Sequence, residues 1–249
     1  NTSTDNEDTN ELIKSGSKTF TTLDGYKNRL TDENKKVLYS TDEVSQSTAL
    51  NMWTSQGKEV LKLDTVIDTQ FIPWLEEKNK EINFVRVDSE LDESIKDDSP
   101  EIADKDGNTK SETLKKMISS ALNNEKVTVQ VQSLKGENSP PSLILLPEQM
   151  RRINDITALM EQKLPGLPEY HNLIVNSNHP LIQGLLKLNS NPIVIEGSSK
   201  SEEGQLASDI AIHVYEMAKL SIGGLENKDI AAFQTRNAEV LGKLMQKFV

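Results

Sequence analysis

The chain has 249 residues, of which 35% are hydrophobic, 27% are charged and 4% are aromatic, and its formal net charge is −11. That length is enough for one large domain or two modest ones, with a core built mainly from aliphatic side chains. The negative charge disfavours nucleic acid and anionic lipid as partners. The lack of an apolar run of about 18 residues excludes a membrane-spanning helix. The lack of cysteine excludes disulfides and thiolate metal sites.

The first half of the chain alternates between predicted strands and helices after an irregular, polar start over residues 1–19. Thr22 or Asp24 is placed to cap a short helix that ends near Leu30. Thr41 is the expected cap of the next helix, and Pro73 favours a break within the one after it. Strands are predicted at residues 36–40, 59–63 and 82–87, with helices between them at residues 41–57 and 68–78. This order predicts a small parallel α/β unit over residues 20–95.

A second domain is predicted over residues 111–249, after an acidic linker at residues 96–110 that lacks a sustained apolar period. Ser111 is the expected cap of its first helix, and Asn178 is the expected cap of a short helix later in the domain. Strands are predicted at residues 126–131, 143–146 and 172–176, and further helices at residues 147–164, 201–220 and 227–248. The expected fold class is therefore α/β followed by α+β, with a short sheet and a terminal helical hairpin in the second domain.

Few residues point to catalysis. The three histidines lack metal-ligand spacing, and the chain has neither a phosphate-binding glycine loop nor a nucleophile elbow. Asp64 and Asp68 flank the end of the second predicted strand, where carboxylates serve either as helix caps or as metal ligands. We assign no catalytic, cofactor-binding or metal-binding residue, and keep as the alternative an independent small α/β metal-dependent enzyme that uses these two aspartates.

The helix predicted at residues 147–164 has one apolar and one polar sector. At 100° per residue the apolar sector contains Met150, Ile153, Ile156 and Met160, while Leu159 lies on the polar side. Such a sector is either an ordinary core face or an adaptable binding surface, since methionine side chains are flexible and polarisable. The pattern alone favours the core face and leaves the binding surface as the alternative.

The last two predicted helices carry more apolar surface than a small sheet can cover. A second copy of the chain would bury that surface in a four-helix bundle, so we expect a homodimer. The residues predicted to form the dimer interface occupy the apolar stripes of the two helices: Leu206, Ile210, Val214, Met217, Ile230, Phe233, Asn237, Val240, Leu241 and Leu244.

Several segments, taken in order, resemble the bacterial ninety-kilodalton heat-shock chaperone family. "TFTTLDGYKNRL" with "KVLYST" is similar to part of the family's middle domain, and "EVLKLDTVIDTQFIPWLEEK" is similar to the strand and helix that follow. "EQMRRINDITALM" lies where the family has an amphipathic helix of its C-terminal domain. "LIVNSNHPLI" and "GGLENKDIAAFQTRNAEVLGKLM" resemble later segments of that domain, so the resemblance covers about residues 18–248.

The resemblance implies a fragment of an ATP-dependent chaperone, namely the later part of the middle domain and the C-terminal dimerisation domain. It implies that the domain that binds ATP and Mg²⁺, and the arginine of the catalytic loop, belong to other parts of a longer chain. The fragment would form a homodimer in the cytoplasm and bind unfolded or partly folded client proteins, without a cofactor or enzymatic activity of its own. The full-length parent would be a slow ATPase of the heat-stress response.

On the same resemblance, the candidate client-binding residues are apolar side chains of two predicted helices: Met150, Ile153, Ile156, Leu159, Met160, Phe71 and Trp74. A third interpretation is a purely structural dimerisation module. Such a module would self-associate but would bind no unfolded protein.

Overall fold

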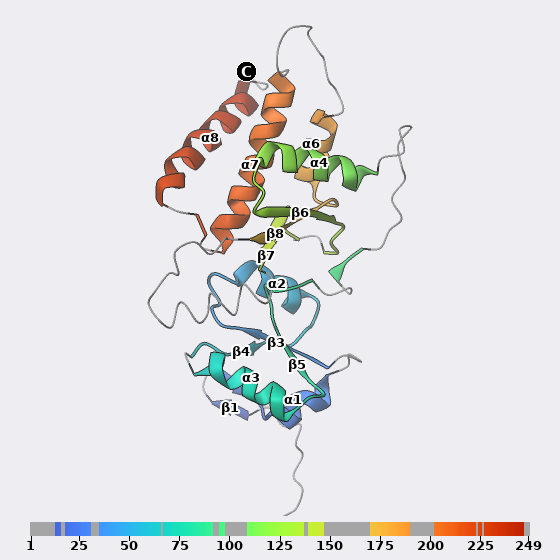
Figure 1. The fold of residues 1–249 in the computed structure, drawn as a ribbon, viewed down its shortest axis with the longest axis vertical. Helices are drawn as coiled ribbons and strands as arrows, with labels where there is room; N and C mark the ends of the chain where they lie inside the picture. Colours follow the sequence, from blue (N-terminus) through green and yellow to red (C-terminus); the bar gives the residue numbers. More distant parts are fainter. Residues whose placement is uncertain are drawn as a thin grey trace, which may run out of the picture. The chain divides into compact units, whose positions relative to one another are not determined.

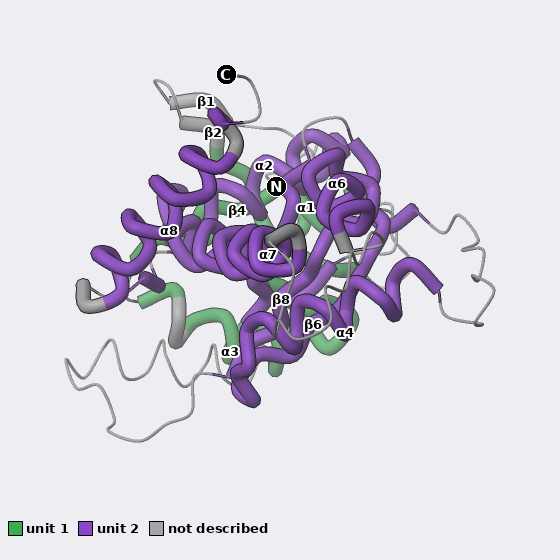
Figure 2. Tube along the Cα trace, turned by 90° about the horizontal axis from the view of Figure 1, so that it is seen from above, with its two compact units in different colours: residues 1–41, 60–86 green, residues 42–59, 87–249 purple. Residues whose placement is uncertain are grey.

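The structure is a computed structural model that describes residues 13–15, 18–30, 35–65, 67–91, 95–97, 109–136, 139–146, 170–189, 202–222, 224–225 and 227–246 (Figure 1). The chain divides into two compact units, which Figure 2 shows in different colours. Unit 1 contains residues 1–41 and 60–86, and unit 2 contains residues 42–59 and 87–249. Unit 2 therefore includes a segment, residues 42–59, that the sequence analysis assigned to the first α/β unit.

Unit 1 contains a two-stranded hairpin and a three-stranded parallel sheet. In the hairpin, β1 (Ile13–Ser15) pairs antiparallel with β2 (Lys18–Phe20), where the sequence analysis expected irregular chain. In the sheet, β3 (Lys36–Ser40) lies between β4 (Leu61–Lys62) and β5 (Asn83–Arg86) and pairs in parallel with both. The parallel pairing of the three strands is as predicted, although β4 and β5 are shorter than expected.

Two helices cover one face of this sheet (Figure 1). α1 (Leu23–Arg29) is capped by Thr22, whose hydroxyl oxygen accepts a hydrogen bond from the backbone N–H of Gly25 at 3.0 Å, so the prediction of Thr22 is confirmed. α3 (Asp68–Lys78) is a single helix that contains Pro73, without the predicted break. The core between sheet and helices buries Tyr26, Val37, Tyr39, Ile72, Ile82 and Phe84.

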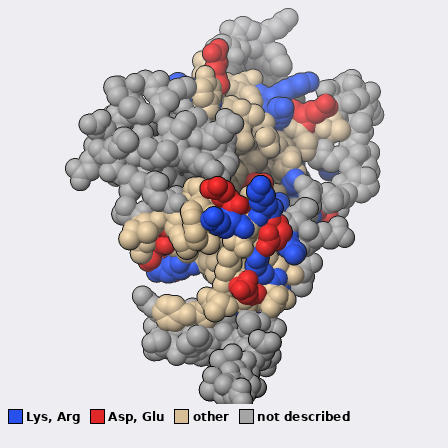
Figure 3. All heavy atoms as spheres, turned by 60° about the horizontal axis from the view of Figure 1, so that its bottom comes forward, with Lys and Arg blue, Asp and Glu red and all other residues tan. Residues whose placement is uncertain are grey.

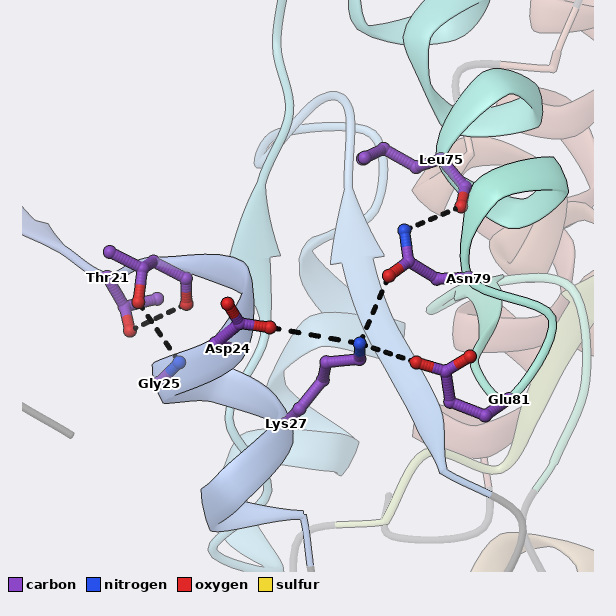
Figure 4. A network of polar contacts seen from close by, with 8 residues as sticks. Thr21, Asp24, Gly25, Lys27, Leu75, Asn79 and Glu81 are labelled. Atoms are coloured by element: carbon purple, nitrogen blue, oxygen red, sulfur yellow. Dashed lines mark hydrogen bonds and ion pairs between the residues drawn. The ribbon is translucent and has the colours of Figure 1, made fainter. Parts of the chain in front are cut away.

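A polar network joins α1 to the turn between α3 and β5 (Figure 4). The ammonium group of Lys27 donates a hydrogen bond to Asn79 Oδ1 at 3.1 Å and forms an ion pair with Glu81. Asn79 lies just beyond the last residue of α3, and its side chain donates a hydrogen bond to the backbone carbonyl of Leu75 at 3.0 Å. Lys27 therefore fixes α1 against the end of α3 through directional contacts, in addition to the apolar core.

Unit 2 begins with α2 (Ser47–Ser55), which is shorter than the helix predicted at residues 41–57. Thr41 is not its cap, because a turn lies between Thr41 and the helix. In that turn Asp42 accepts hydrogen bonds from the backbone N–H of Val44 and from the hydroxyl of Ser45. Val44 is 82% exposed in that turn. Trp53 anchors α2, since its buried indole N–H donates to the backbone carbonyl of Val87 at 2.9 Å.

The predicted linker at residues 96–110 is ordered where it starts. Ile95, just before it, is buried. The backbone N–H of Asp97 donates a hydrogen bond to the backbone carbonyl of Ser133, the residue that follows the strand Val127–Gln132. After a gap in the described residues, α4 (Lys110–Leu122) is capped by Thr109 rather than by the predicted Ser111. Thr109 and Glu112 form a capping box in which each side chain accepts a hydrogen bond from the backbone N–H of the other.

The sheet of unit 2 is mixed. β8 (His171–Asn176) is its central strand, parallel to β6 (Val127–Gln132) and antiparallel to β7 (Ser142–Leu145). α4, α6 (Pro180–Asn189) and α7 (Glu202–Ser221) lie on one face of this sheet and enclose the main core with it (Figure 1). α8 (Asn227–Gln246) packs along α7, so a short sheet and a terminal helical hairpin are both present as predicted.

The cap of α6 also differs from the predicted one. The helix begins at Pro180, directly after His179, and His179 Nδ1 accepts a hydrogen bond from the backbone N–H of Leu181 at 3.1 Å. His179 is therefore the cap, and Asn178 lies one residue too early. Burial lowers the pKa of His179, which favours the neutral imidazole that this hydrogen bond requires.

Asn176 joins three segments of unit 2 at a buried position. Its Oδ1 accepts a hydrogen bond from the backbone N–H of Leu134 at 3.1 Å, and its Nδ2 donates to the carbonyl of Pro140 at 3.2 Å. We expect Asn176→Ala to lower the free energy of unfolding of unit 2 by about 2–3 kcal/mol, because a buried donor and a buried acceptor lose their partner. Urea denaturation followed by Trp53 fluorescence measures this loss in a Trp74→Phe background, where Trp53 is the one tryptophan left.

Asn178→Ala is the matched control for this experiment. The side chain of Asn178 donates to Asp97 at an exposed position, 3.2 Å away, and to the carbonyl of Leu134 at 3.5 Å, so its removal should lower the free energy of unfolding by less than about 1 kcal/mol. Equal losses in the two variants would contradict the special role of Asn176.

Lys27 should also set the titration of Glu81. The hydrogen bond from Lys27 is the largest cause of a lowered pKa for the Glu81 carboxyl in the folded chain. The stability that Glu81 contributes is therefore complete above its ordinary pKa of 4.5 and is lost as the pH falls through its folded value. In Lys27→Met we expect the pKa of Glu81 to rise towards 4.5, measured by NMR of the carboxyl carbons, whereas exposed Lys80→Met should leave it in place. A pKa that is unchanged in Lys27→Met would refute the pairing.

Candidate interaction surfaces

α3 carries an exposed apolar face on a different side of the helix from its buried residue Ile72. Ile67, Phe71 and Trp74 are 75%, 45% and 50% exposed, and we call these three residues the α3 patch. Their spacing of four and three residues places them on one side of the helix. The rings of Phe71 and Trp74 stack with their centroids 5.3 Å apart and their planes at 18°. The α3 patch is thus a preformed apolar surface of unit 1.

The described charged side chains offer no comparable feature. Among the described residues that Figure 3 shows, acidic and basic side chains are interspersed rather than gathered into a field of one sign. In unit 1, Lys62 forms an ion pair with Asp64 at 3.3 Å and Lys27 forms one with Glu81, so nearby opposite charges compensate each other. Within the described part of unit 1, the α3 patch is therefore the feature that best suits an apolar partner.

Three of the predicted interface residues on α7 face the core of their own chain. Leu206, Ile210 and Val214 are 5%, 8% and 0% exposed and belong to the main core of unit 2. Met217, another predicted interface residue, is 43% exposed, and Leu220 is 45% exposed. Of the described apolar side chains of α7, the large ones that are available to a partner lie at its C-terminal end.

The predicted apolar stripe of α8 faces α7. The ring of Phe233 stacks on His213 of α7 with centroids 5.2 Å apart, and Val240 is buried in the main core. Ile230 and Asn237 are half-buried on the same side of the helix. The side chain of Leu244 lies outside the described residues. This stripe therefore packs within the chain, and another face of α8 points to solvent.

The exposed face of α8, which we call the outer face, has its own regular spacing. Its residues follow one another at alternating intervals of three and four, the spacing of helices that pack side by side. They are Ala231, Gln234, Ala238, Leu241 and Met245. Leu241 is 53% exposed and Met245 is 63% exposed, while the two alanines leave room for close approach of another helix. Leu241 is the one predicted interface residue of α8 that lies on this face.

The five client-binding candidates of the helix predicted at residues 147–164 lie outside the residues that the structure describes. They are Met150, Ile153, Ile156, Leu159 and Met160. Their exposure, and the helix itself, therefore stay predictions.

Asp64 and Asp68 both make contacts with their own stretch of chain. Asp64 pairs with Lys62, and Asp68 Oδ2 accepts a hydrogen bond from the backbone N–H of Thr65 at 2.9 Å at the start of α3. In the described ranges, no three histidine, aspartate or glutamate side chains lie close enough together to hold a metal ion. The geometry does not favour the alternative of a metal-dependent enzyme. Among the described helices, none combines the length and the hydropathy that crossing a bilayer requires.

Some residues of these surfaces were missed by sequence reasoning. Ile67 lies four residues before Phe71, and Met245 lies four residues after Leu241, so helical spacing carried a usable signal for both. The contact between Glu216 and Arg236 left no such signal, because the two residues are 20 positions apart on two different helices.

Known proteins that resemble this chain share one family and one name. The family described as "Hsp90 protein" matches residues 11–247. Chaperone protein HtpG of Porphyromonas gingivalis is 31% identical over 191 residues, which cover 67% of this chain and 27% of that protein. Chaperone protein HtpG of Bacteroides fragilis is 30% identical over 167 residues, which cover 64% of this chain and 24% of that protein. Chaperone protein HtpG of Bacteroides thetaiotaomicron is 29% identical over 170 residues, which cover 62% of this chain and 23% of that protein.

The chain spans about a quarter of the length of the curated relatives that it matches. The family match extends through both units and includes the α3 patch and the whole of α8. The resemblance predicted from the sequence is confirmed, and the chain belongs to the Hsp90 family.

Proposed function

We propose that this chain is the self-associating and client-binding part of a molecular chaperone that acts on unfolded or partly folded proteins. The observation that carries the proposal is the exposure of large apolar side chains on regular helices in a chain of the Hsp90 family. Apolar surface in water costs free energy that a partner removes by covering it. Two such surfaces are described, one in each unit, and we assign them to different partners.

The outer face of α8 is assigned to a second copy of the chain. Its alternating spacing suits another helix packed alongside, with Leu241 and Met245 as the large contacts and Ala231 and Ala238 as the small ones. A two-fold axis would pair the α7–α8 hairpins of two copies into a four-helix bundle. The proposed interface thus keeps Met217 and Leu241 from the sequence prediction and replaces its buried members.

The α3 patch is assigned to client proteins. An unfolded chain presents apolar side chains in no fixed order, so its receptor needs a surface without strong directional requirements. A pair of stacked, half-exposed aromatic rings meets that need, because ring faces accept many apolar partners. We propose that Met150, Ile153, Ile156, Leu159 and Met160 add to the surface that binds clients.

ATP chemistry is assigned to the rest of a longer protein. In a protein of the relatives' full length, residues outside this chain would bind ATP and Mg²⁺ and support a slow ATPase. This chain would then contribute self-association and client contact, with no catalytic residue of its own.

Loss of the outer face should separate the two copies. We expect the double substitution Leu241→Ser with Met245→Ser to raise the dimer dissociation constant about 100-fold or more, because each change occurs twice in a symmetric interface and each removes apolar burial of about 1 kcal/mol. Sedimentation equilibrium across micromolar concentrations measures the constant. Gln234→Ser, a polar change on the same face, should alter it by less than about threefold. A wild-type chain that is monomeric at every concentration would refute the homodimer.

Loss of one ring of the α3 patch should weaken client binding. We expect Phe71→Ser to raise the dissociation constant of a permanently unfolded protein about 5–10-fold, because it removes about 1–1.5 kcal/mol of apolar burial. The probe is reduced and carboxamidomethylated ribonuclease A, which contains no tryptophan of its own. Binding is read from acrylamide quenching, since the half-exposed Trp74 is accessible to acrylamide and Trp53, which is 2% exposed, is not. A bound client should therefore protect Trp74 from the quencher.

Glu77→Ser is the control for this measurement, because Glu77 is an exposed polar residue of the same helix. It should leave the affinity within about twofold at two salt concentrations, which separates apolar contact from charge attraction. If Phe71→Ser binds the unfolded probe as tightly as the wild-type chain does, the α3 patch is not a client site.

A further inference from the structure

α7 and α8 are joined by a buried ion pair. Glu216 on α7 is 8% exposed, and its Oε1 accepts a hydrogen bond from Arg236 Nη1 on α8. The side chain of Arg236 is 23% exposed, so both charges are largely removed from water. The second carboxylate oxygen of Glu216 is buried and has no hydrogen-bond partner among the described residues. This carboxylate therefore depends on Arg236 for its compensation.

His213 lies one turn before Glu216 on the same side of α7. Its imidazole stacks on the ring of Phe233 from α8, with centroids 5.2 Å apart and planes at 9°. Its Nδ1 is buried and makes no hydrogen bond within the described part of the chain. Burial is the largest influence on the pKa of His213 and lowers it, Glu216 raises it and Arg236 lowers it further. The packed form of the hairpin therefore favours a neutral imidazole.

Apolar contacts give α8 little additional anchoring. Val240 is the one residue of α8 that is buried among those whose side chains are described. By contrast, α7 buries Leu206, Ala207, Ile210, Ala211, Val214 and Ala218. A second ion pair, between Asp209 and Lys243 at 3.0 Å, is more exposed on the lysine side and worth correspondingly less. The position of α8 on α7 therefore rests largely on His213, Glu216, Phe233 and Arg236, which we call the polar latch.

We propose that Arg236, Glu216 and His213 are positioning residues for self-association, which hold α8 on α7 so that its outer face meets a second copy of the chain. This inference rests on the proposed function, since it concerns the same surface. None of the three residues belongs to the outer face. They act by placing α8 on α7. Without the contacts of the polar latch, α8 no longer holds Leu241 and Met245 at a fixed distance from α7.

Hydrogen–deuterium exchange of α8 tests the latch separately from self-association. In Arg236→Gln, which leaves the Glu216 carboxylate buried without its cation, we expect amide exchange of peptides from residues 227–246 to rise about tenfold or more. Exchange is measured on the whole chain at concentrations below the dimer dissociation constant. Sedimentation at higher concentration should show a matching loss of the dimer.

Two further variants distinguish a positioning role from a general loss of stability. Arg236→Lys retains the cation and should restore much of the protection, and Glu216→Gln combined with Arg236→Gln should do so as well, because no unpaired charge is left. Exchange in α4 and in β6 should stay at the wild-type level in all of these variants. Faster exchange there would show that unit 2 as a whole had been destabilised and would overturn the inference.

The pH dependence supplies an independent readout. The charged groups that act on His213 are Glu216 on its own helix and Arg236 on α8, with Asp209 and Lys243 one turn away. Because the packed state has the lower pKa, protection of α8 should be complete above the ordinary value of 6.5 and should fall as the pH drops below it. His213→Phe keeps an aromatic ring against Phe233 and removes the titration, so it should flatten the profile after correction for intrinsic exchange rates.

The possible failures are distinguishable. Wild-type protection of α8 in Arg236→Gln would overturn the latch, whatever the oligomeric state. A variant that loses the dimer while α8 stays protected would make Arg236 an interface contact instead of a positioning residue. A wild-type chain that is always monomeric would overturn the proposed self-association, while the exchange of α8 would still report on the latch.

Discussion

The burial of α7 is the constraint on which the rest of unit 2 depends. One side of this helix supplies the main core with leucine, isoleucine, valine and three alanines, which meet the sheet and the helices α4 and α6. The backbone is held as well, because the hydroxyl of Ser142 in β7 donates to the carbonyl of Val214 at 2.9 Å. α7 cannot turn this side outward without opening the core. Its orientation therefore fixes which side chains remain for α8.

The side of α7 that remains for α8 is rich in polar groups. The carboxylates of Asp209 and Glu216 form ion pairs with Lys243 and Arg236 of α8, respectively. The imidazole of His213 stacks on the ring of Phe233 of α8. Such contacts are directional, whereas aliphatic packing tolerates sliding and rotation. A helix held in this way gains a defined orientation from few contacts. The same division leaves the apolar residues Leu241 and Met245 on another side of α8, where they are more than half exposed within the described part of the chain.

The sequence analysis succeeded where a residue's local pattern determines its role. The parallel pairing of β3, β4 and β5 follows from alternation of strands and helices, and the Thr22 cap follows from a hydroxyl placed before a turn of helix. It did not anticipate which face of α8 the chain itself covers, because two stripes compete there. The stripe with Phe233 and Val240 is the more hydrophobic, and the pattern could not reveal that the chain's own α7 would cover it.

Caps and helix starts failed for a related reason. Thr41, Ser111 and Asn178 are all suitable cap residues. Ser111 and Asn178 lie within two residues of the actual caps, whereas Thr41 lies five residues before Gln46, which precedes α2. The choice between neighbouring candidates depends on the path of the chain before the helix. Asp42 forms a turn that delays α2, and His179 uses its ring nitrogen at α6 because Pro180 already fixes the first helical position. One-dimensional patterns contain the candidates but not the tertiary path that selects among them.

The exposed apolar surfaces and the acidic charge of the chain constrain each other. Leu241, Met245 and the α3 patch would promote indiscriminate association in a neutral protein, because apolar attraction is not selective. A net charge of −11 on each copy opposes association at distances up to about the Debye length, roughly 8 Å at physiological ionic strength. Two copies that bury a large apolar area between them overcome this repulsion, and two copies that bury only a small apolar area do not. The repulsion between acidic copies thus turns an unselective attraction into a requirement for fit, which applies to the second copy proposed at α8.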